Sequence, residues 1–90
     1  MEFKNLKEAE FWRLAETLTL SDFTLCESNN DPGKFHLIAQ QPSKKIAFSI
    51  RHARTNTPRT WRLDIIAKAL HQHGITEFHV RMQPTVNQDT

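Results

Sequence analysis

The stretch from Ser49 to Arg62, SIRHARTNTPRTWR, concentrates residue types that could bind or cleave a phosphodiester. It carries four arginines, one histidine and one tryptophan, and it has no acidic residue. Guanidinium groups pair with phosphate oxygens, an indole ring can stack on a base, and a histidine can carry a proton near neutral pH. The stretch therefore predicts contact with a polyanion.

Charge is segregated along the whole chain. Residues 1–33 hold three basic and seven acidic residues, whereas residues 34–63 hold seven basic residues and no acidic one, so the formal net charge of +2 hides a concentrated basic block. Such a block is typical of a surface that binds nucleic acid, and interleaving with the acidic block in the folded chain is the alternative. The predicted phosphate contacts are Lys34, Lys44, Lys45, Arg51, Arg54, Arg59 and Arg62.

Two histidines are the candidates for acid–base chemistry. His36 lies close to Lys34 in the sequence, and His52 follows Arg51. Cleavage of RNA without a metal needs a base for the 2′-hydroxyl and cations for the developing charge. Each histidine also fits a solvated surface position, so cleavage and simple binding both stay open. Trp61 and Trp12 are candidates for base stacking or protein contact, with packing against the fold as the alternative.

The residue inventory disfavours several other kinds of protein. Gly33 and Gly74 are the two glycines of the chain, so there is no glycine-rich phosphate loop, and one cysteine, Cys26, does not build a structural zinc site. We expect no metal and no cofactor. No apolar run approaches the roughly 18 residues of a membrane span, and a lone cysteine is typical of a reducing, cytoplasmic setting.

Hydrophobic periodicity predicts the elements that must position these side chains. A helix is expected over 5–19, with Phe11, Leu14, Ala15 and Leu18 on its apolar stripe. Strands are expected over 22–28, 34–40 and 45–51, joined by the turn-forming stretches NNDPG and QPSK.

A second helix and a fourth strand are expected to complete the domain. Thr57 followed by Pro58 predicts the start of the helix, and Gly74 with Ile75 predicts its end. Its expected inner stripe is Leu63, Ile66, Ala67 and Leu70, widened by Ile65 and Ala69. Residues 76–82 alternate as a short strand with Phe78, Val80 and Met82 inward.

The resulting fold class is α+β, a two-layer sandwich of order αβββα(β). We expect an antiparallel three-stranded meander with a short fourth strand, and both helices on one face of the sheet. Residues 1–82 form a single domain, and residues 83–90 form a flexible C-terminal tail. The other face, or its rim, is expected to display polar residues: Thr24, His36, Gln40, Ser49 and Arg51, together with His79 and Arg81.

A family resemblance rests on a series of short motifs in this order. They are Phe23-Thr24-Leu25, Gly33-Lys34-Phe35-His36, Pro42-Ser43-Lys44-Lys45, Phe48-Ser49-Ile50-Arg51-His52 and the helix ending at Gly74-Ile75. Over residues 6–78 the chain resembles the HicA family of toxin ribonucleases, whose αβββα fold is similar to double-stranded-RNA-binding domains. The resemblance implies RNA binding, metal-independent endoribonuclease activity and an antitoxin partner. The family's catalytic histidine follows its glycine by two positions, where Phe35 stands here and His36 is the next residue.

Two functions follow from the sequence. The first is a small domain that binds RNA or another nucleic acid, with ribonuclease activity as an extension. The second is a non-enzymatic interaction module, such as a nucleic-acid-binding regulator or a small phage- or plasmid-type inhibitor of a host protein, which would use edge strands and tryptophans as contacts. Both are compatible with a homo-oligomer.

Overall fold

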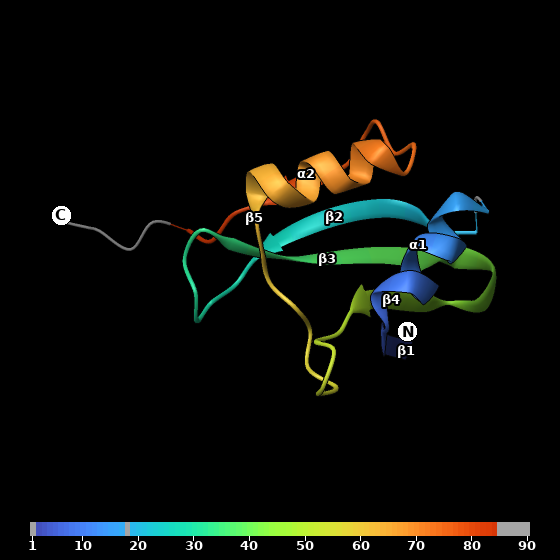
Figure 1. The fold of residues 1–90 in the computed structure, drawn as a ribbon, viewed down its shortest axis with the longest axis horizontal. Coiled ribbons are helices and arrows are strands. Elements are labelled where there is room, and N and C mark those ends of the chain that lie inside the picture. The colour runs from blue at the N-terminus through green and yellow to red at the C-terminus, as the bar shows by residue number, and fades with distance from the viewer. Residues whose placement is uncertain (1, 18, 85–90) are drawn as a thin grey trace, which may run out of the picture.

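The fold is one mixed sheet covered on one face by two helices. The computed structural model describes residues 2–17 and 19–84. The α+β two-layer sandwich predicted from the sequence is confirmed (Figure 1). In chain order the elements are β1 (Glu2–Leu6), α1 (Glu8–Glu16), β2 (Ser21–Glu27), β3 (Lys34–Gln41), the 3-10 turn η1 (Pro42–Lys44), β4 (Ile46–Ile50), β5 (Trp61–Arg62), α2 (Leu63–Gln72) and β6 (His79–Arg81).

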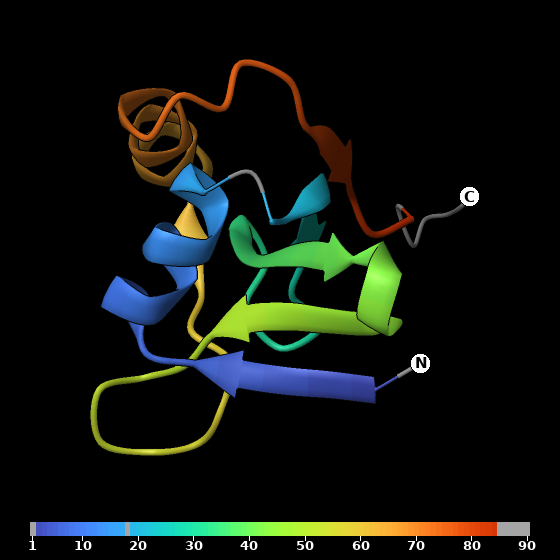
Figure 2. The ribbon, with the colours of Figure 1, turned by 90° about the vertical axis from the view of Figure 1, so that its right-hand side faces the viewer.

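The strands of the described chain lie in the order β1-β4-β3-β2-β6, and β5 pairs with the start of β3. β2, β3 and β4 form the expected antiparallel meander. β1 runs parallel to β4 at one end of the order, and β6 runs parallel to β2 at the other end. Both helices lie on the same side of this sheet (Figure 2).

The core lies between the sheet and the two helices because alternate residues of the central strands face the helices. Phe11 from α1 and Ile66 and Leu70 from α2 are fully buried against this face. The sheet supplies Phe23, Leu25, Phe35, Leu37, Ala39, Phe48 and Ile50. Leu14 is half-buried against the same cluster, and the predicted inward position of Leu18 lies outside the described residues.

The prediction of a single helix over 5–19 is wrong at its start, because residues 2–6 form β1 and the helix begins at Glu8. β1 is an edge strand in which Leu6 packs against the core while Phe3 is about half exposed. Its sequence therefore lacks the apolar alternation by which a half-buried strand is recognised. The strand is held instead by its ladder to β4, which includes the Arg51 amide donating to the Leu6 carbonyl at 2.8 Å.

The predicted start of the second helix at Thr57 and Pro58 is also wrong, because α2 begins at Leu63. Pro58 forms a bridge with Arg51, and the Arg59 amide donates to the Ile50 carbonyl at 2.7 Å. β5 then pairs with β3, with Trp61 opposite Phe35. Pairing with the sheet outcompetes a local helix-start signal here, and Leu63 consequently lies at the exposed N-terminal end of α2, 39% exposed.

The end of α2 follows its sequence. Gly74 has a φ of +84°, its amide donates to the His71 carbonyl at 3.0 Å, and the Ile75 amide donates to the Leu70 carbonyl at 2.9 Å. These are the two hydrogen bonds of a Schellman motif, which needs a left-handed residue at this position. Ile75 packs against the core, as predicted.

The C-terminal strand differs from its prediction in burial. Phe78, which precedes β6, packs against the core, but Val80 is 43% and Met82 66% exposed, so these two side chains are not inward core residues. α2 packs against β5 and β3, which leaves Val80 and Met82 exposed. Within the predicted tail, Gln83 bonds to Glu27, and residues 85–90 lie outside the described residues.

Candidate nucleic-acid interface

The register of the sheet divides the seven predicted phosphate contacts between its two ends. Lys34 opens β3 and pairs with Arg62, and Arg51 and Arg59 adjoin the end of β4 at Ile50. We call the group at this end the basic end, and it consists of Lys34, Arg51, Arg54, Arg59 and Arg62.

Lys44 and Lys45 lie at the opposite end of β3. From Lys34 to Gln41 β3 spans roughly 23 Å, at about 3.3 Å per residue. Figure 2 shows the η1 turn on the side opposite the loop that carries Arg54. These two lysines therefore cannot contact the same phosphate as the basic end.

The loop 51–58 is a hairpin excursion that leaves the sheet and returns to it. The His52 amide donates to the Thr57 carbonyl at 2.9 Å, and Asn5 of β1 donates from Nδ2 to the Asn56 carbonyl at 3.1 Å. Arg51 donates from Nη1 to the carbonyls of His52 at 3.2 Å and Thr55 at 3.4 Å. Arg51 therefore braces the loop.

The loop 51–58 is exposed because it extends away from the sheet. Arg54 and His52 project from the sheet as exposed side chains. The hairpin extends past β1 and α1 as the yellow-green segment of Figure 2. An exposed basic hairpin of this kind can reach the backbone of a nucleic acid without displacing any of the core.

A cleft of about 200 Å³ lies where the start of α1 meets this loop. We call it the α1 cleft, and its lining residues are Lys7, Glu8, Arg51, His52, Ala53 and Arg59. Lys7 is the N-cap of α1, and no side chain caps that helix end. The lining brings together two guanidinium groups, one ammonium and one imidazole around a single carboxylate.

Arg59 is the best-positioned cation of the α1 cleft. Its guanidinium carbon lies 3.7 Å from the centre of the Trp61 ring, and its Nη1 donates to Glu8 Oε1 at 3.2 Å. The aromatic face and the carboxylate hold the guanidinium from two sides, which limits the side-chain entropy that it can lose on binding a ligand.

Lys34, His36, Arg62 and Arg81 lie at one end of the sheet face turned away from the helices. Strand alternation and pairing put Cys26 opposite His36 and Arg81 beside Cys26 on this face. His36 Nδ1 lies 3.3 Å from the Arg59 carbonyl oxygen. The β2–β3 pairing has no bulge at this point, so Phe35 is buried in the core and His36 faces outward. The α1 cleft is therefore lined by His52 without His36.

The register also confirms the outer face for Thr24, Gln40, Ser49 and His79. Ser49 is nevertheless fully buried. Its small side chain on a central strand lies between Asn5 and Ile38, and these larger neighbours on the same face cover it. Ser49 does not contribute to a binding surface.

Neither tryptophan offers a free ring to a base. Trp12 is 6% and Trp61 7% exposed. The Trp12 ring stacks on His73 with centroids 4.2 Å apart, and its Nε1 donates to Glu8 Oε2 at 3.2 Å. Trp61 packs between the sheet and Arg59. The structure thus supports the packing interpretation of both residues and gives no support to base stacking or to exposed protein contacts.

Lys7 and Glu8 are the cleft residues that sequence reasoning missed. The helix predicted over 5–19 includes both residues in its first turn, because the strand before them has no recognisable pattern. Lys7 lies one residue beyond Leu6, and Arg51 one residue beyond Ile50, at the matching ends of the parallel pair β1–β4. The acidic residues Glu8 and Glu10 are a signal for a helix that begins near Glu8, because negative charge in the first turn is favoured by the helix dipole.

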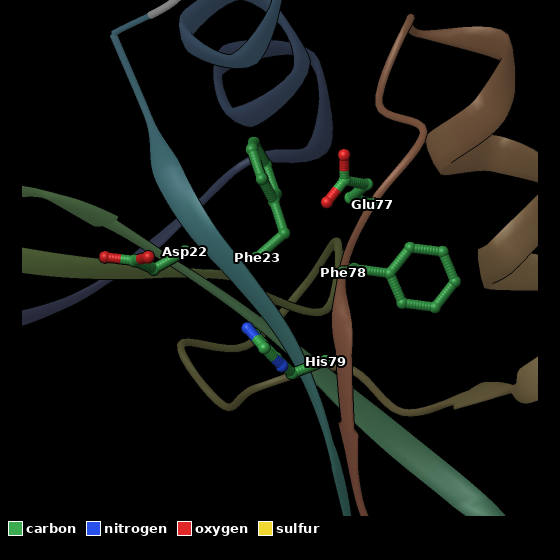
Figure 3. Close-up of a pocket in the computed structure, with 5 residues that line it drawn as sticks. All are labelled: Asp22, Phe23, Glu77, Phe78 and His79. Carbon is green, nitrogen blue, oxygen red and sulfur yellow. The ribbon is translucent and has the colours of Figure 1, made fainter.

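Two further cavities lie on the other side of the molecule. One of about 240 Å³ lies between β2 and β6, and Figure 3 shows its acidic side chains, Asp22 and Glu77, on opposite sides of the β2 ribbon. A larger groove of about 600 Å³ includes Glu27, whose pKa is lowered by hydrogen bonds from the backbone amides of Gly33 and Gln83. Neither cavity gathers the cations that a polyanion needs.

Comparison with known proteins adds no assignment. No family model, no curated protein and no solved structure gives a significant match to this chain. Within residues 2–17 and 19–84 no group of three or more histidine, cysteine or acidic side chains is arranged to hold a metal ion. No helix in the same part of the chain is both long and apolar enough to cross a bilayer.

Proposed function

We propose that the protein binds RNA through its phosphates, using the basic end of the sheet and the hairpin loop 51–58. The observation that carries this proposal is that two pairs of cations lie toward the same end of the sheet: Lys34 with Arg62 at the start of β3, and Arg51 with Arg59 at the end of β4, where they line the α1 cleft. Contacts of this kind give affinity without reading sequence, because they reach the backbone and not the base edges.

The choice of RNA over DNA rests on the resemblance to HicA toxins. The buried tryptophans argue for phosphate contact as the main source of affinity, because no indole face is free to stack. An endoribonuclease with an antitoxin partner is the extension that the resemblance implies. It would depend on His52, since His36 lies on the outer sheet face and not in the α1 cleft.

Two double variants with equal loss of charge test the proposal. Lys34→Ala with Arg54→Ala removes two cations of the basic end, and Lys44→Ala with Lys45→Ala removes two cations from the far end. We expect the first variant to weaken binding of a short single-stranded RNA at low salt by about tenfold, and the second to leave it nearly unchanged. Fluorescence anisotropy of a labelled RNA measures both.

Two outcomes would contradict the proposal. One is the absence of detectable binding by the unmodified protein at low salt. The other is an equal loss of affinity in the two double variants, because binding would then follow net charge and not the basic end. The same variants assayed with DNA of matched sequence test the choice of nucleic acid.

A second function is favoured by a separate observation. β6 stands at the end of the strand order with Val80 and Met82 exposed beside it, which is the arrangement of an edge that accepts a partner's strand. A protein-binding module of this kind would lose its partner on Met82→Asp and keep it in the Lys34→Ala, Arg54→Ala variant. If the protein binds RNA through the basic end, RNA binding should persist in Met82→Asp and weaken in the Lys34→Ala, Arg54→Ala variant.

A further inference from the structure

Glu8 is the acidic member of the α1 cleft, and both of its carboxylate oxygens are engaged. Oε1 accepts from Arg59 Nη1 at 3.2 Å, and Oε2 accepts from Trp12 Nε1 at 3.2 Å. Glu8 thus accepts a hydrogen bond from the guanidinium of Arg59, the cation of the cleft that is best positioned to bind an anion. In the unliganded protein a carboxylate stands where a phosphate oxygen would bind.

The contact between Glu8 and Arg59 is of a kind that a phosphate can replace. Both side chains are substantially exposed, 46% for Glu8 and 41% for Arg59. An exposed pair of this sort is worth about 0–1 kcal/mol, whereas a guanidinium binds phosphate oxygens through two parallel hydrogen bonds. Arg59 keeps its place on Trp61 while its anionic partner changes.

We propose that the α1 cleft is a discrete site for one phosphate group of the bound strand, and that this phosphate displaces Glu8 from Arg59. Arg59 binds the phosphate directly, while Lys7 and His52 line the same cleft and add positive charge. Glu8 acts as an internal competitor that sets the affinity of the site. The inference rests on the proposed function, because the ligand is a phosphate of the RNA backbone.

The Glu8 carboxylate has a second hydrogen-bond donor, the indole of Trp12. Trp12 continues to donate to Glu8 when Arg59 is released, and the Trp12 ring is fixed by its stacking on His73. His73 is held in turn by Glu16 of α1, 2.5 Å from its Nδ1. Glu8 can therefore turn away from Arg59 without leaving its carboxylate unpaired, and the Trp12 indole senses the change.

The test is Glu8→Gln, which removes the negative charge but keeps an oxygen that accepts from Trp12. The matched control is Glu10→Gln, an exposed acid of the same helical turn with the same change in net charge. We expect Glu8→Gln to tighten binding of a short single-stranded RNA about three- to fivefold. Glu10→Gln should change the affinity clearly less.

An Arg59→Gln background provides a second test that does not depend on one variant. Arg59→Gln alone should weaken RNA binding, and adding Glu8→Gln to it should give no further tightening, because the two residues act at one site. Tryptophan emission should change on RNA binding in the presence of Glu8 and change less in Glu8→Gln.

The outcomes separate this site from the proposed function. If the protein binds RNA and loses affinity in the basic-end variant, while Glu8→Gln and Glu10→Gln have equal effects, the phosphate site is wrong and RNA binding stands. Tightening by Glu8→Gln that persists in the Arg59→Gln background also overturns the site. If no variant binds RNA at low salt, both proposals fail.

Discussion

Glu8 connects three parts of the molecule through two oxygens. It accepts from Arg59 in the segment that leads into β5 and from Trp12 one turn further along α1, and Trp12 stacks on His73 at the end of α2. Glu8 makes both contacts at once, because each of its two oxygens accepts one hydrogen bond. At the residue scale, the contact of Glu8 with Arg59 thus determines whether the Arg59 guanidinium is available to another anion.

The sequence could predict only part of this arrangement. The sequence predicts Arg59 as a phosphate contact because this residue belongs to a block free of acidic residues. Its pairing with Glu8 is not predicted, because the two residues are 51 positions apart and meet only after β1 and β4 align in parallel. Long-range pairs of this kind have no local sequence signal.

Glu27 provides a pH-dependent prediction at the same scale. Hydrogen bonds from the amides of Gly33 and Gln83 lower its pKa below the ordinary value of 4.5. Such a carboxyl group has a lower pKa in the folded than in the unfolded protein. It therefore stabilises the fold at pH values above its pKa in the unfolded protein. That contribution is lost as the pH falls through the folded value. We expect Glu27→Gln to lower the Tm at pH 7, and we expect this difference to shrink as the pH falls below 4.5.

Thermal unfolding followed by circular dichroism over this pH range measures the effect. Glu10→Gln serves as the control, since Glu10 is an exposed acid on α1. A Tm difference for Glu27→Gln that stays constant from pH 7 to strongly acidic pH would contradict the assignment.

Among the elements, the most informative difference from sequence expectation is β1. Strands β2, β3 and β4 were predictable because each alternates an apolar core-facing residue with an outward-facing one, and Gly33 and Gly74 mark a turn and a helix end that need a positive φ. β1 has Leu6 in the core but Phe3 outside it, so its backbone pairing and not its side-chain pattern defines it. The same reason explains why β5 was taken as the start of a helix.

Proline substitution tests the pairing of β1. The Glu2 amide donates to the Lys45 carbonyl and the Leu6 carbonyl accepts from the Arg51 amide, so alternation in a parallel ladder makes the Lys4 amide face β4 and the Phe3 amide face away. We expect Lys4→Pro to destabilise the protein by about 1–3 kcal/mol more than Phe3→Pro, because a ladder hydrogen bond is lost. Urea unfolding of the two variants measures the difference. Equal destabilisation would mean that residues 2–6 do not pair in this register.

Across the whole molecule, folding keeps most of the charge segregation of the sequence. Arg59 pairs with Glu8 of the acidic block and Arg62 pairs with its neighbour Asp64. In the described part of the chain the other five cations of residues 34–63 form no ion pair. The sequence left open whether acidic residues would interleave with the basic block, and the structure limits this interleaving to one contact in the α1 cleft. The far-end position of Lys44 and Lys45 was implicit in the sequence, because the predicted strand over 34–40 and the turn QPSK separate these lysines from Lys34.

The salt dependence of RNA binding tests the central claim most directly. If the basic end neutralises phosphates, the logarithm of the binding constant falls linearly with the logarithm of salt concentration, with a slope of about −0.7 for each phosphate contact on a single strand. Full engagement of the five cations predicts a slope of about −3.5, and the Lys34→Ala, Arg54→Ala variant should be shallower by about 1.4. A slope near zero, or an unchanged slope in that variant, would contradict phosphate binding by the basic end.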